Sequence, residues 1–217
     1  QAYQLYSALI RSRQINKITK PLKEIAMSCS SYISLMHCKV PEFISKSIVV
    51  LDGDVIEQEG KRLEKILKNK NIVFLPSKLA PDQLLFEFFY NLPADDPYWK
   101  NNPIKLTKPV FKQIANEIIT RLKIEGEAID LYEYIKNHKK DKNETNKLRE
   151  LFKNFNTNST IEKLISGKIE FNPFAVWAKR NKSETDVFAD RMKEYLKLVL
   201  SNGHHISDTL IESYFIE

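Results

Sequence analysis

The sequence has few of the residues that mark several specialised classes of protein. Five glycines in 217 residues exclude a collagen-like or elastic chain. Two cysteines, Cys29 and Cys38, are too few for a disulfide scaffold, and no Cys-x-x-Cys or His-x-x-x-His spacing indicates zinc. The apolar run at 48–51 has the length of a strand, whereas a membrane span needs roughly 18 residues. We therefore expect both cysteines to be small core residues of a cytoplasmic protein that has no membrane partner.

The sequence also lacks an initiator methionine and a signal peptide. It begins Gln1-Ala2-Tyr3, and these opening residues already have the spacing of a helix. It contains no low-complexity tract and no internal repeat. We therefore expect the chain to be a piece of a longer polypeptide.

Apolar and basic residues are both plentiful. Hydrophobic residues make up 42% of the chain and aromatic residues 11%, which is enough to form a packed core. The net charge is +6, but residues 136–182 hold 12 basic and 5 acidic side chains, a net charge of +7. A local basic surface suits a nucleic-acid backbone, because each neutralised phosphate releases counterions. The alternative is a solvated lysine-rich face, and charge alone does not decide between the two.

The first part of the chain alternates strands and helices. The predicted strands are the apolar runs at 47–51 and 72–75, and predicted helices follow them at 57–67 and 81–92. Earlier helices are expected at 2–12 and from Thr19 to Cys29, whereas 31–36 fits either a helix or a strand. Strands that are apolar on both faces and have short helical connections predict an α/β fold with a parallel sheet.

The second part of the chain has a helical pattern. Four prolines between 93 and 109 predict a loop, and helices are expected at about 107–122, 127–137 and 143–155. An apolar stretch at 171–177 precedes a helix that we expect Ser183 to cap and Gly203 to end. We accordingly divide the chain into an α/β core at 1–92, a helical insertion at 93–165 and a closing segment at 166–217.

The segment with the clearest chemistry is Asp52-Gly53-Asp54, at the carboxyl end of the first predicted strand. Ligands of open α/β sheets bind at this edge, and residues two apart on a strand face the same way. Two converging carboxylates repel each other, and a hard cation such as Mg²⁺ relieves the repulsion. Gly53 allows a backbone or a phosphate to approach closely. The alternative is a simple turn, since Asp-Gly is a common turn dipeptide.

An apolar strand that ends in Asp-x-Asp, after a helix of the type AYQLYSALI, resembles a TOPRIM domain. The stretch FLPSKLAPDQLLFE at 74–87 is similar to the segment that follows Asp-x-Asp in nucleases of the OLD (overcoming lysogenisation defect) family. The resemblance covers residues 1–92 well and the later helices loosely. It implies a TOPRIM-like, Rossmann-like parallel sheet whose first strand, with its catalytic glutamate, lies upstream of Gln1.

The resemblance also implies site residues. Asp52 and Asp54 would bind one or two Mg²⁺ or Mn²⁺ ions, and Glu87 would serve a second ion. Lys182 would stabilise charge on the phosphate, and Lys179 and Arg180 would bind nucleic acid beside it. For Glu87 the alternative is an ion pair at the rim of a helix, and for the three basic residues it is a solvated turn.

Two further groups attract attention. His204 and His205 follow a glycine that ends a helix, where adjacent histidines are usually exposed and inert. Tyr98 and Trp99 lie in the proline-rich segment. They could stack on a base, but we expect them to anchor that segment to the core.

The resemblance as a whole implies a metal-dependent DNA endonuclease of antiviral defence. Its expected partners are DNA, an ABC-type ATPase domain in the same polypeptide, and further copies of the chain. Only the ATPase domain would bind ATP. A defence-system RNA or a reverse transcriptase is a further possible partner. Two other hypotheses remain open: a non-catalytic TOPRIM-like scaffold, and a phosphatase of the haloacid-dehalogenase type, although Val55-Ile56 replaces the Gly-Thr that usually follows the second Asp there.

Overall fold

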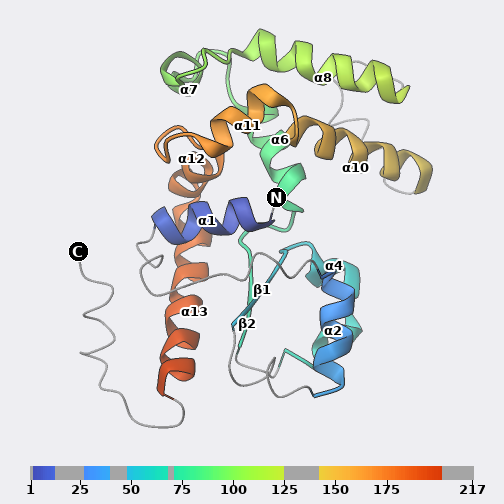
Figure 1. Ribbon diagram of the computed structural model, residues 1–217, viewed down its shortest axis with the longest axis vertical. Coiled ribbons are helices and arrows are strands. Elements are labelled where there is room, and N and C mark those ends of the chain that lie inside the picture. The colour runs from blue at the N-terminus through green and yellow to red at the C-terminus, as the bar shows by residue number, and fades with distance from the viewer. Residues whose placement is uncertain (1, 13–26, 40–47, 68–70, 125–141, 202–217) are drawn as a thin grey trace. The chain divides into compact units, whose positions relative to one another are not determined.

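The computed structural model describes residues 2–12, 27–39, 48–67, 71–124 and 142–201 (Figure 1). These residues form two compact units. The sheet unit comprises the described residues of 2–80 together with those after 177, and the helical unit comprises those of 81–177. These divisions lie at 80/81 and 177/178, whereas the sequence pattern places them at 92/93 and 165/166.

Two short parallel strands form the sheet. β1 (Val49–Leu51) pairs with β2 (Ile72–Phe74) in the register Val49↔Ile72 and Leu51↔Phe74. The bonds from Val49 N to the Asn71 carbonyl and from Leu75 N to the Leu51 carbonyl extend the pairing, each at 2.8 Å. Both predicted strands and their parallel pairing are confirmed. The described residues are mostly helical around this small sheet, which agrees with the expected α/β class at that coarse level.

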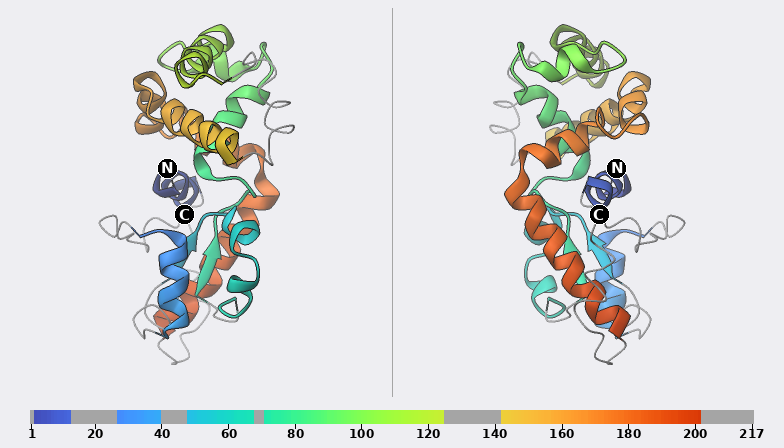
Figure 2. Two further views of the ribbon diagram at one scale, coloured as in Figure 1. Left: turned by 90° about the vertical axis from the view of Figure 1, so that its right-hand side faces the viewer. Right: turned by 90° about the vertical axis from the view of Figure 1, so that its left-hand side faces the viewer.

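Helices cover both faces of the sheet. On one face, a core forms around α2 (Cys29–His37), the short α5 (Lys61–Glu64) and alternate residues of both strands, including Leu51 and Ile72. On the other face, α13 (Lys182–Ser201) packs against β2, and α1 (Ala2–Ser12) packs against α13 (Figures 1 and 2). Strands that are apolar on both faces need this arrangement, because a helical layer on each face removes the side chains of that face from water.

The helices of the sheet unit differ from expectation in two places. The helix expected at 57–67 is instead two short helices, α4 (Val55–Glu59) and α5, separated by Gly60 at φ 39°. Glycine adopts this left-handed backbone without steric cost, so it interrupts the helix. The ambiguous stretch 31–36 is helical, within α2. The helix expected from Thr19 falls mostly outside the described residues.

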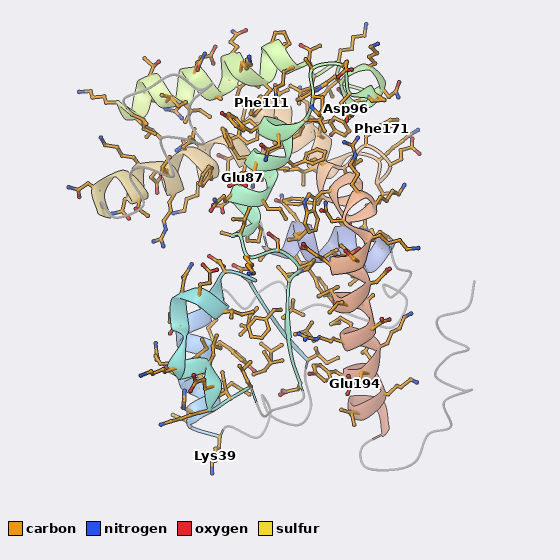
Figure 3. The ribbon with its side chains drawn as sticks, turned by 180° about the vertical axis from the view of Figure 1, so that it is seen from behind. Lys39, Glu87, Asp96, Phe111, Phe171 and Glu194 are labelled. Carbon is orange, nitrogen blue, oxygen red and sulfur yellow. The ribbon has the colours of Figure 1, made fainter. Side chains whose placement is uncertain are left out.

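The helical unit packs around aromatic side chains. Its helices are α6 (Pro81–Asn91), α7 (Pro97–Asn101), α8 (Lys108–Leu122), α10 (Lys142–Asn156) and α11 (Ser159–Ser166), and α12 (Pro173–Arg180) begins in it. α10 packs against both α6 and α8. Phe86 contacts Phe155 edge-on at 5.1 Å and Phe111 at 5.5 Å between ring centroids, and Phe111 is marked in Figure 3. The helices predicted at 81–92, 107–122 and 143–155 are confirmed; the one at 127–137 lies outside the described residues.

The proline-rich segment is more ordered than the expected loop. It contains α7, which Asp96 caps by accepting a hydrogen bond from Tyr98 N at 2.9 Å. Tyr98 and Trp99 are 6% and 4% exposed, so base stacking is wrong and their predicted role as anchors is confirmed. The Tyr98 hydroxyl donates to the Phe171 carbonyl at 2.9 Å, and Trp99 Nε1 donates to the Pro93 carbonyl at 2.7 Å.

The C-terminal helices also depart from expectation. The apolar stretch 171–177 lies largely in a helix, α12, and only Asn181 separates α12 from α13. Because α13 begins at Lys182, Ser183 lies inside its first turn, and the prediction that Ser183 precedes and caps the helix is wrong. Gly203, His204 and His205 lie outside the described residues.

Candidate metal and nucleic-acid site

Asp52 and Asp54 lie in a turn that joins β1 to α4. The strand ends at Leu51, and Val55 N donates to the Asp52 carbonyl at 3.3 Å across the turn. The prediction that both carboxylates lie on one face of a strand is therefore wrong, since neither aspartate belongs to the strand. Both side chains are half-buried. The turn that was the alternative interpretation is present, and it still delivers two carboxylates to the carboxyl end of a parallel strand.

Gly53 is held against the backbone that leaves β2. A Cβ at this position would lie 1.8 Å from the Ser77 carbonyl oxygen and 2.7 Å from the Leu75 carbonyl oxygen. The expected close approach of a backbone at Gly53 is therefore confirmed. Ser77 itself has a φ of 84°. Consequently the Asp-Gly-Asp turn has a defined position relative to the exit from the neighbouring strand.

α4 orders the second aspartate. Asp54 directly precedes this helix, and Gln58 Nε2, one turn later, donates a hydrogen bond to Asp54 Oδ2. Backbone N–H groups of Glu57 and Gln58 both donate to the Asp54 carbonyl at 3.1 Å. Val55 is 3% exposed and anchors the start of α4 in the core. The Asp54 carboxylate is thus oriented by the helix that follows it.

The amino end of α2 lies beside the same turn. Burial raises the pKa of the Cys29 thiol, a backbone hydrogen bond from Asp52 opposes this shift, and the charges of Asp52, Asp54 and Glu59 raise the pKa further. These interactions place Cys29 next to the aspartates and keep its thiol protonated, so it is a poor nucleophile. Cys29 is half-buried at the edge of the core. Cys38 is exposed, so its prediction as a core residue is wrong.

A polar network ties α2 to α4 and α5. Glu59 Oε1 accepts a hydrogen bond from the Ser30 hydroxyl, and Glu59 Oε2 forms an ion pair with Arg62 Nη1 at 2.7 Å. Arg62 Nη2 donates to the Ser34 hydroxyl at 3.2 Å. The Glu59 side chain is only 12% exposed. No local sequence pattern indicates that Glu59 has a hydrogen-bond partner 29 residues away.

The donor set at the turn meets the minimum that magnesium needs. Mg²⁺ is often held by one or two carboxylates, with water and substrate phosphate oxygens completing its shell. Asp52 and Asp54 can supply those carboxylates. Among the residues that the structure describes, no three or more His, Cys, Asp or Glu side chains are grouped so that they could hold a metal ion. The two aspartates therefore fit a metal that substrate and water also coordinate, and they do not form an all-protein cage.

Glu87 belongs to the other unit. It is half-buried on α6, and its Oε1 accepts a hydrogen bond from Gln83 Nε2 at 2.8 Å (Figure 3). The predicted ligand set of Asp52, Asp54 and Glu87 is thus not assembled within either compact unit. The other interpretation of Glu87 was an ion pair at the rim of its helix. The partner that the structure gives it is instead the uncharged Gln83 amide on the same helix.

The three predicted basic residues surround the junction of α12 and α13. Lys179 and Arg180 end α12, Lys182 begins α13, and all three side chains are exposed. The fully buried Thr185 supports the junction, because its hydroxyl lies 3.1 Å from the carbonyl oxygens of Ala178, Asn181 and Lys182. Within the sheet unit, α13 runs opposite to the strands, so its amino end lies towards the end of the sheet where they finish (Figure 1).

The basic segment predicted at 136–182 does not form one surface. Its first six residues lie outside the described part. Residues 142–177 belong to the helical unit and carry six basic and four acidic side chains, a net charge of +2. Residues 178–182 belong to the sheet unit and carry a net charge of +3. The densest positive charge of the described segment is therefore at the junction of α12 and α13.

Comparison with protein-family models, curated proteins and solved structures finds no significant match. Within the described ranges, no helix is both long enough and apolar enough to cross a membrane. Any functional conclusion consequently depends on the residues and geometry set out above.

Proposed function

We propose that the chain is part of a metal-dependent DNA endonuclease of the OLD-like TOPRIM type, with Asp52 and Asp54 as its metal-binding carboxylates. One observation carries the proposal: the Asp-Gly-Asp turn directly follows a parallel strand and is packed against the exit of the next strand. This is the edge where α/β sheets bind their ligands. Half-buried carboxylates there are suited to a hard cation and a phosphate.

The proposed reaction is hydrolysis of a phosphodiester. When bound, Mg²⁺ or Mn²⁺ supplies Lewis-acid stabilisation of charge on the phosphate oxygens. Asp52 and Asp54 orient the cation, and Gln58 holds the Asp54 carboxylate in place. Lys182, with Lys179 and Arg180 beside it, stabilises negative charge on the substrate from the amino end of α13. The role of Glu87 towards a second ion stays a prediction of the resemblance, because Glu87 belongs to the helical unit.

The wider assignment follows from the same resemblance. It places an ABC-type ATPase domain elsewhere in the same polypeptide, and any use of ATP would belong to that domain. It also implies a cytoplasmic homo-oligomer that acts in antiviral defence. A defence-system RNA or a reverse transcriptase is a further proposed partner. The second candidate function is a TOPRIM-like scaffold without catalysis. The phosphatase hypothesis is supported only by the apolar strand followed by Asp-x-Asp, a pattern that both classes of enzyme share.

The first test measures metal binding without DNA. The free Mn²⁺ signal in electron paramagnetic resonance is titrated with the full polypeptide and with its Asp52→Asn and Asp54→Asn variants. We expect each variant to weaken Mn²⁺ binding at least tenfold. Glu64→Gln is the matched control, because Glu64 is an exposed acid of the same unit. Equal affinity in all four proteins would contradict the assignment of the metal site.

The second test measures cleavage. Supercoiled plasmid is incubated with the same four proteins and Mg²⁺ or Mn²⁺. Nicking or linearisation by the unmodified protein and Glu64→Gln, but not by the aspartate variants, supports the nuclease. Metal binding without cleavage of any nucleic acid favours the scaffold, and hydrolysis of small phosphomonoesters alone favours the phosphatase. Cleavage that survives in the double aspartate variant refutes the proposed site.

A further inference from the structure

The loop that leaves β2 lies directly against the Asp-Gly-Asp turn. It comprises residues 76–80, all of which belong to the sheet unit. A Cβ at Gly53 would lie 1.8 Å from the Ser77 carbonyl oxygen and 3.0 Å from the Ser77 carbonyl carbon. That carbon is bonded to the backbone nitrogen of Lys78. The residue that follows the contact with Gly53 is therefore a lysine.

The backbone that leads to Lys78 is held in a defined conformation. Ser77 has a φ of 84°, which is unfavourable for a non-glycine residue and persists only where surrounding contacts hold it. Such contacts are present, because Leu75 and Pro76 are buried and the Ser77 hydroxyl accepts a hydrogen bond from Leu79 N at 3.1 Å. The point from which the Lys78 side chain starts is consequently fixed relative to the turn.

Covalent geometry limits the distance between Lys78 and the two carboxylates. The Lys78 Cα lies about 2.4 Å from the Ser77 carbonyl carbon, hence within about 6 Å of the Cβ position of Gly53. Asp52 and Asp54 are the neighbours of Gly53 along the chain, each with its Cα about 3.8 Å away. An extended lysine stem places the ammonium about 6 Å from its own Cα. The Lys78 ammonium can therefore reach a phosphate that is bound at the turn.

The side chain of Lys78 is available to an anion. It is exposed, and among the residues that the structure describes it has neither an ion-pair nor a hydrogen-bond partner. By contrast, the exposed Arg62 of the same unit pairs with Glu59 at 2.7 Å. Residues 76–80 include no acid, so the loop does not neutralise its own cation.

The charges of the proposed reaction call for a cation at this place. Asp52 and Asp54 carry two negative charges, which one bound divalent ion balances. A phosphodiester adds one negative charge, and the attacking hydroxide adds another in the transition state. A positive group beside the metal stabilises both the bound phosphate and the transition state. A lysine ammonium suits this role, because it is a compact charge with three rotatable donors.

We infer that Lys78 is a phosphate-binding residue of the site that Asp52 and Asp54 form. Its ammonium donates to a non-bridging phosphate oxygen from the loop after β2, whereas Lys182 acts from the amino end of α13. The inference rests on the proposed function, since it assigns the partner of the substrate phosphate at that same site. The experiments below separate its failure from failure of the proposed function.

The first measurement concerns metal binding without a phosphate. The free Mn²⁺ signal in electron paramagnetic resonance is titrated with the full polypeptide and with its Lys78→Gln, Lys78→Arg and Lys39→Gln variants. Lys39 is the matched control, because it is an exposed lysine just after α2, about 15 Å along the helix axis from Cys29 and the turn (Figure 3). At about 8 Å in water, one positive charge lowers the affinity of a divalent ion up to about sixfold.

We therefore expect Lys78→Gln to bind Mn²⁺ about two- to sixfold more tightly at low salt, and the other two variants to match the unmodified protein. A residue that only supports the fold would instead weaken Mn²⁺ binding or lower the melting temperature, which circular dichroism melts measure.

The second measurement concerns the phosphate. Broadening of the phosphorus NMR signal of inorganic phosphate by bound Mn²⁺ is recorded with the same proteins at saturating metal. Lys78→Gln should weaken phosphate binding by roughly fivefold or more, and Lys78→Arg should retain most of it. In plasmid nicking, kcat/KM should fall by roughly tenfold or more in Lys78→Gln and should be partly restored in Lys78→Arg. Lys39→Gln should change neither quantity.

The outcomes distinguish the two proposals. Unchanged phosphate affinity and kcat/KM in a folded Lys78→Gln protein would overturn the inference and leave Asp52 and Asp54 as the metal site. Unchanged Mn²⁺ binding in Asp52→Asn and Asp54→Asn refutes the metal site, and both proposals then fail. Binding of Mn²⁺ and phosphate without cleavage of nucleic acid removes the nuclease, yet a loss of phosphate binding in Lys78→Gln alone still supports the role of Lys78.

Discussion

Gly53 offers the most direct test of how the candidate site is built. An added Cβ would meet two backbone oxygens, at 1.8 Å from Ser77 and 2.7 Å from Leu75. Ordinary van der Waals contact begins at 3.4 Å, so Gly53→Ala must displace one backbone segment by roughly 1.6 Å from its neighbour. Because both atoms are backbone, no side-chain rotation relieves the clash. Overpacking a well-packed site costs about 1–3 kcal/mol. We expect the upper end of that range here.

Gly60 is the matched control for this substitution. A Cβ on Gly60 meets nothing within 4 Å, but its φ of 39° is unfavourable for alanine. With a ψ of −114°, Gly60 lies outside the left-handed helical region, and such a sparsely populated backbone costs a non-glycine residue about 1–3 kcal/mol. Because a Cβ on Gly60 has room, Gly60→Ala should destabilise the sheet unit less than Gly53→Ala, although both remove a glycine from the same turn-and-helix segment.

Native-state hydrogen exchange is the suitable assay. The amides of Val49 and Leu75 donate to the carbonyls that extend the sheet pairing, so their protection reports on that unit. Gly53→Ala should reduce the opening free energy of these amides by about 3 kcal/mol, and Gly60→Ala should reduce it by less. Equal reductions, or a smaller reduction in Gly53→Ala, would refute the argument that the turn is packed against the exit from β2.

Four further predictions concern groups whose roles became visible only in the structure. Lys108 Nζ donates to the carbonyls that end α6, at 2.9 Å to Phe89 and to Leu92, so Lys108→Met should lower the unfolding free energy by about 2 kcal/mol, measured by urea titration. Thr185→Val should destabilise α13 by about 1–2 kcal/mol because it removes a buried hydroxyl, while Thr185→Ser should restore part of that stability in the same titration. Iodoacetamide at pH 8.5 should label Cys38 well before Cys29, since burial and nearby carboxylates raise the pKa of Cys29; equal rates would contradict this. The Cys29 thiol stays protonated in the folded protein while the unfolded thiol ionises, so stability should fall as pH rises above about 9, and Cys29→Ser should reduce that fall.

Local patterns in the sequence were sufficient for the elements that build the sheet and its site. Two β-branched apolar runs predicted parallel strands, and both form because every face of such a strand must be covered. The sequence also placed Asp52 and Asp54 at the end of the first strand. It did not show that they lie in a turn, because the strand ends one residue before the first carboxylate and that boundary depends on hydrogen bonds to β2.

The remaining features depend on contacts between distant segments. Three features of the site join residues more than 20 positions apart. They are the approach of Ser77 to Gly53, the contact of Ser30 with Glu59 and the position of Cys29 beside Asp52. The Glu59–Arg62 ion pair is the exception, because it is local in the sequence. No periodicity encodes such contacts. The assignment of Glu87 and the Asp-Gly-Asp turn to different compact units is likewise a tertiary result. The sequence by itself thus determined which residues carry the candidate chemistry. Tertiary packing alone decided which of them meet, because that depends on how the chain covers both faces of a two-stranded sheet.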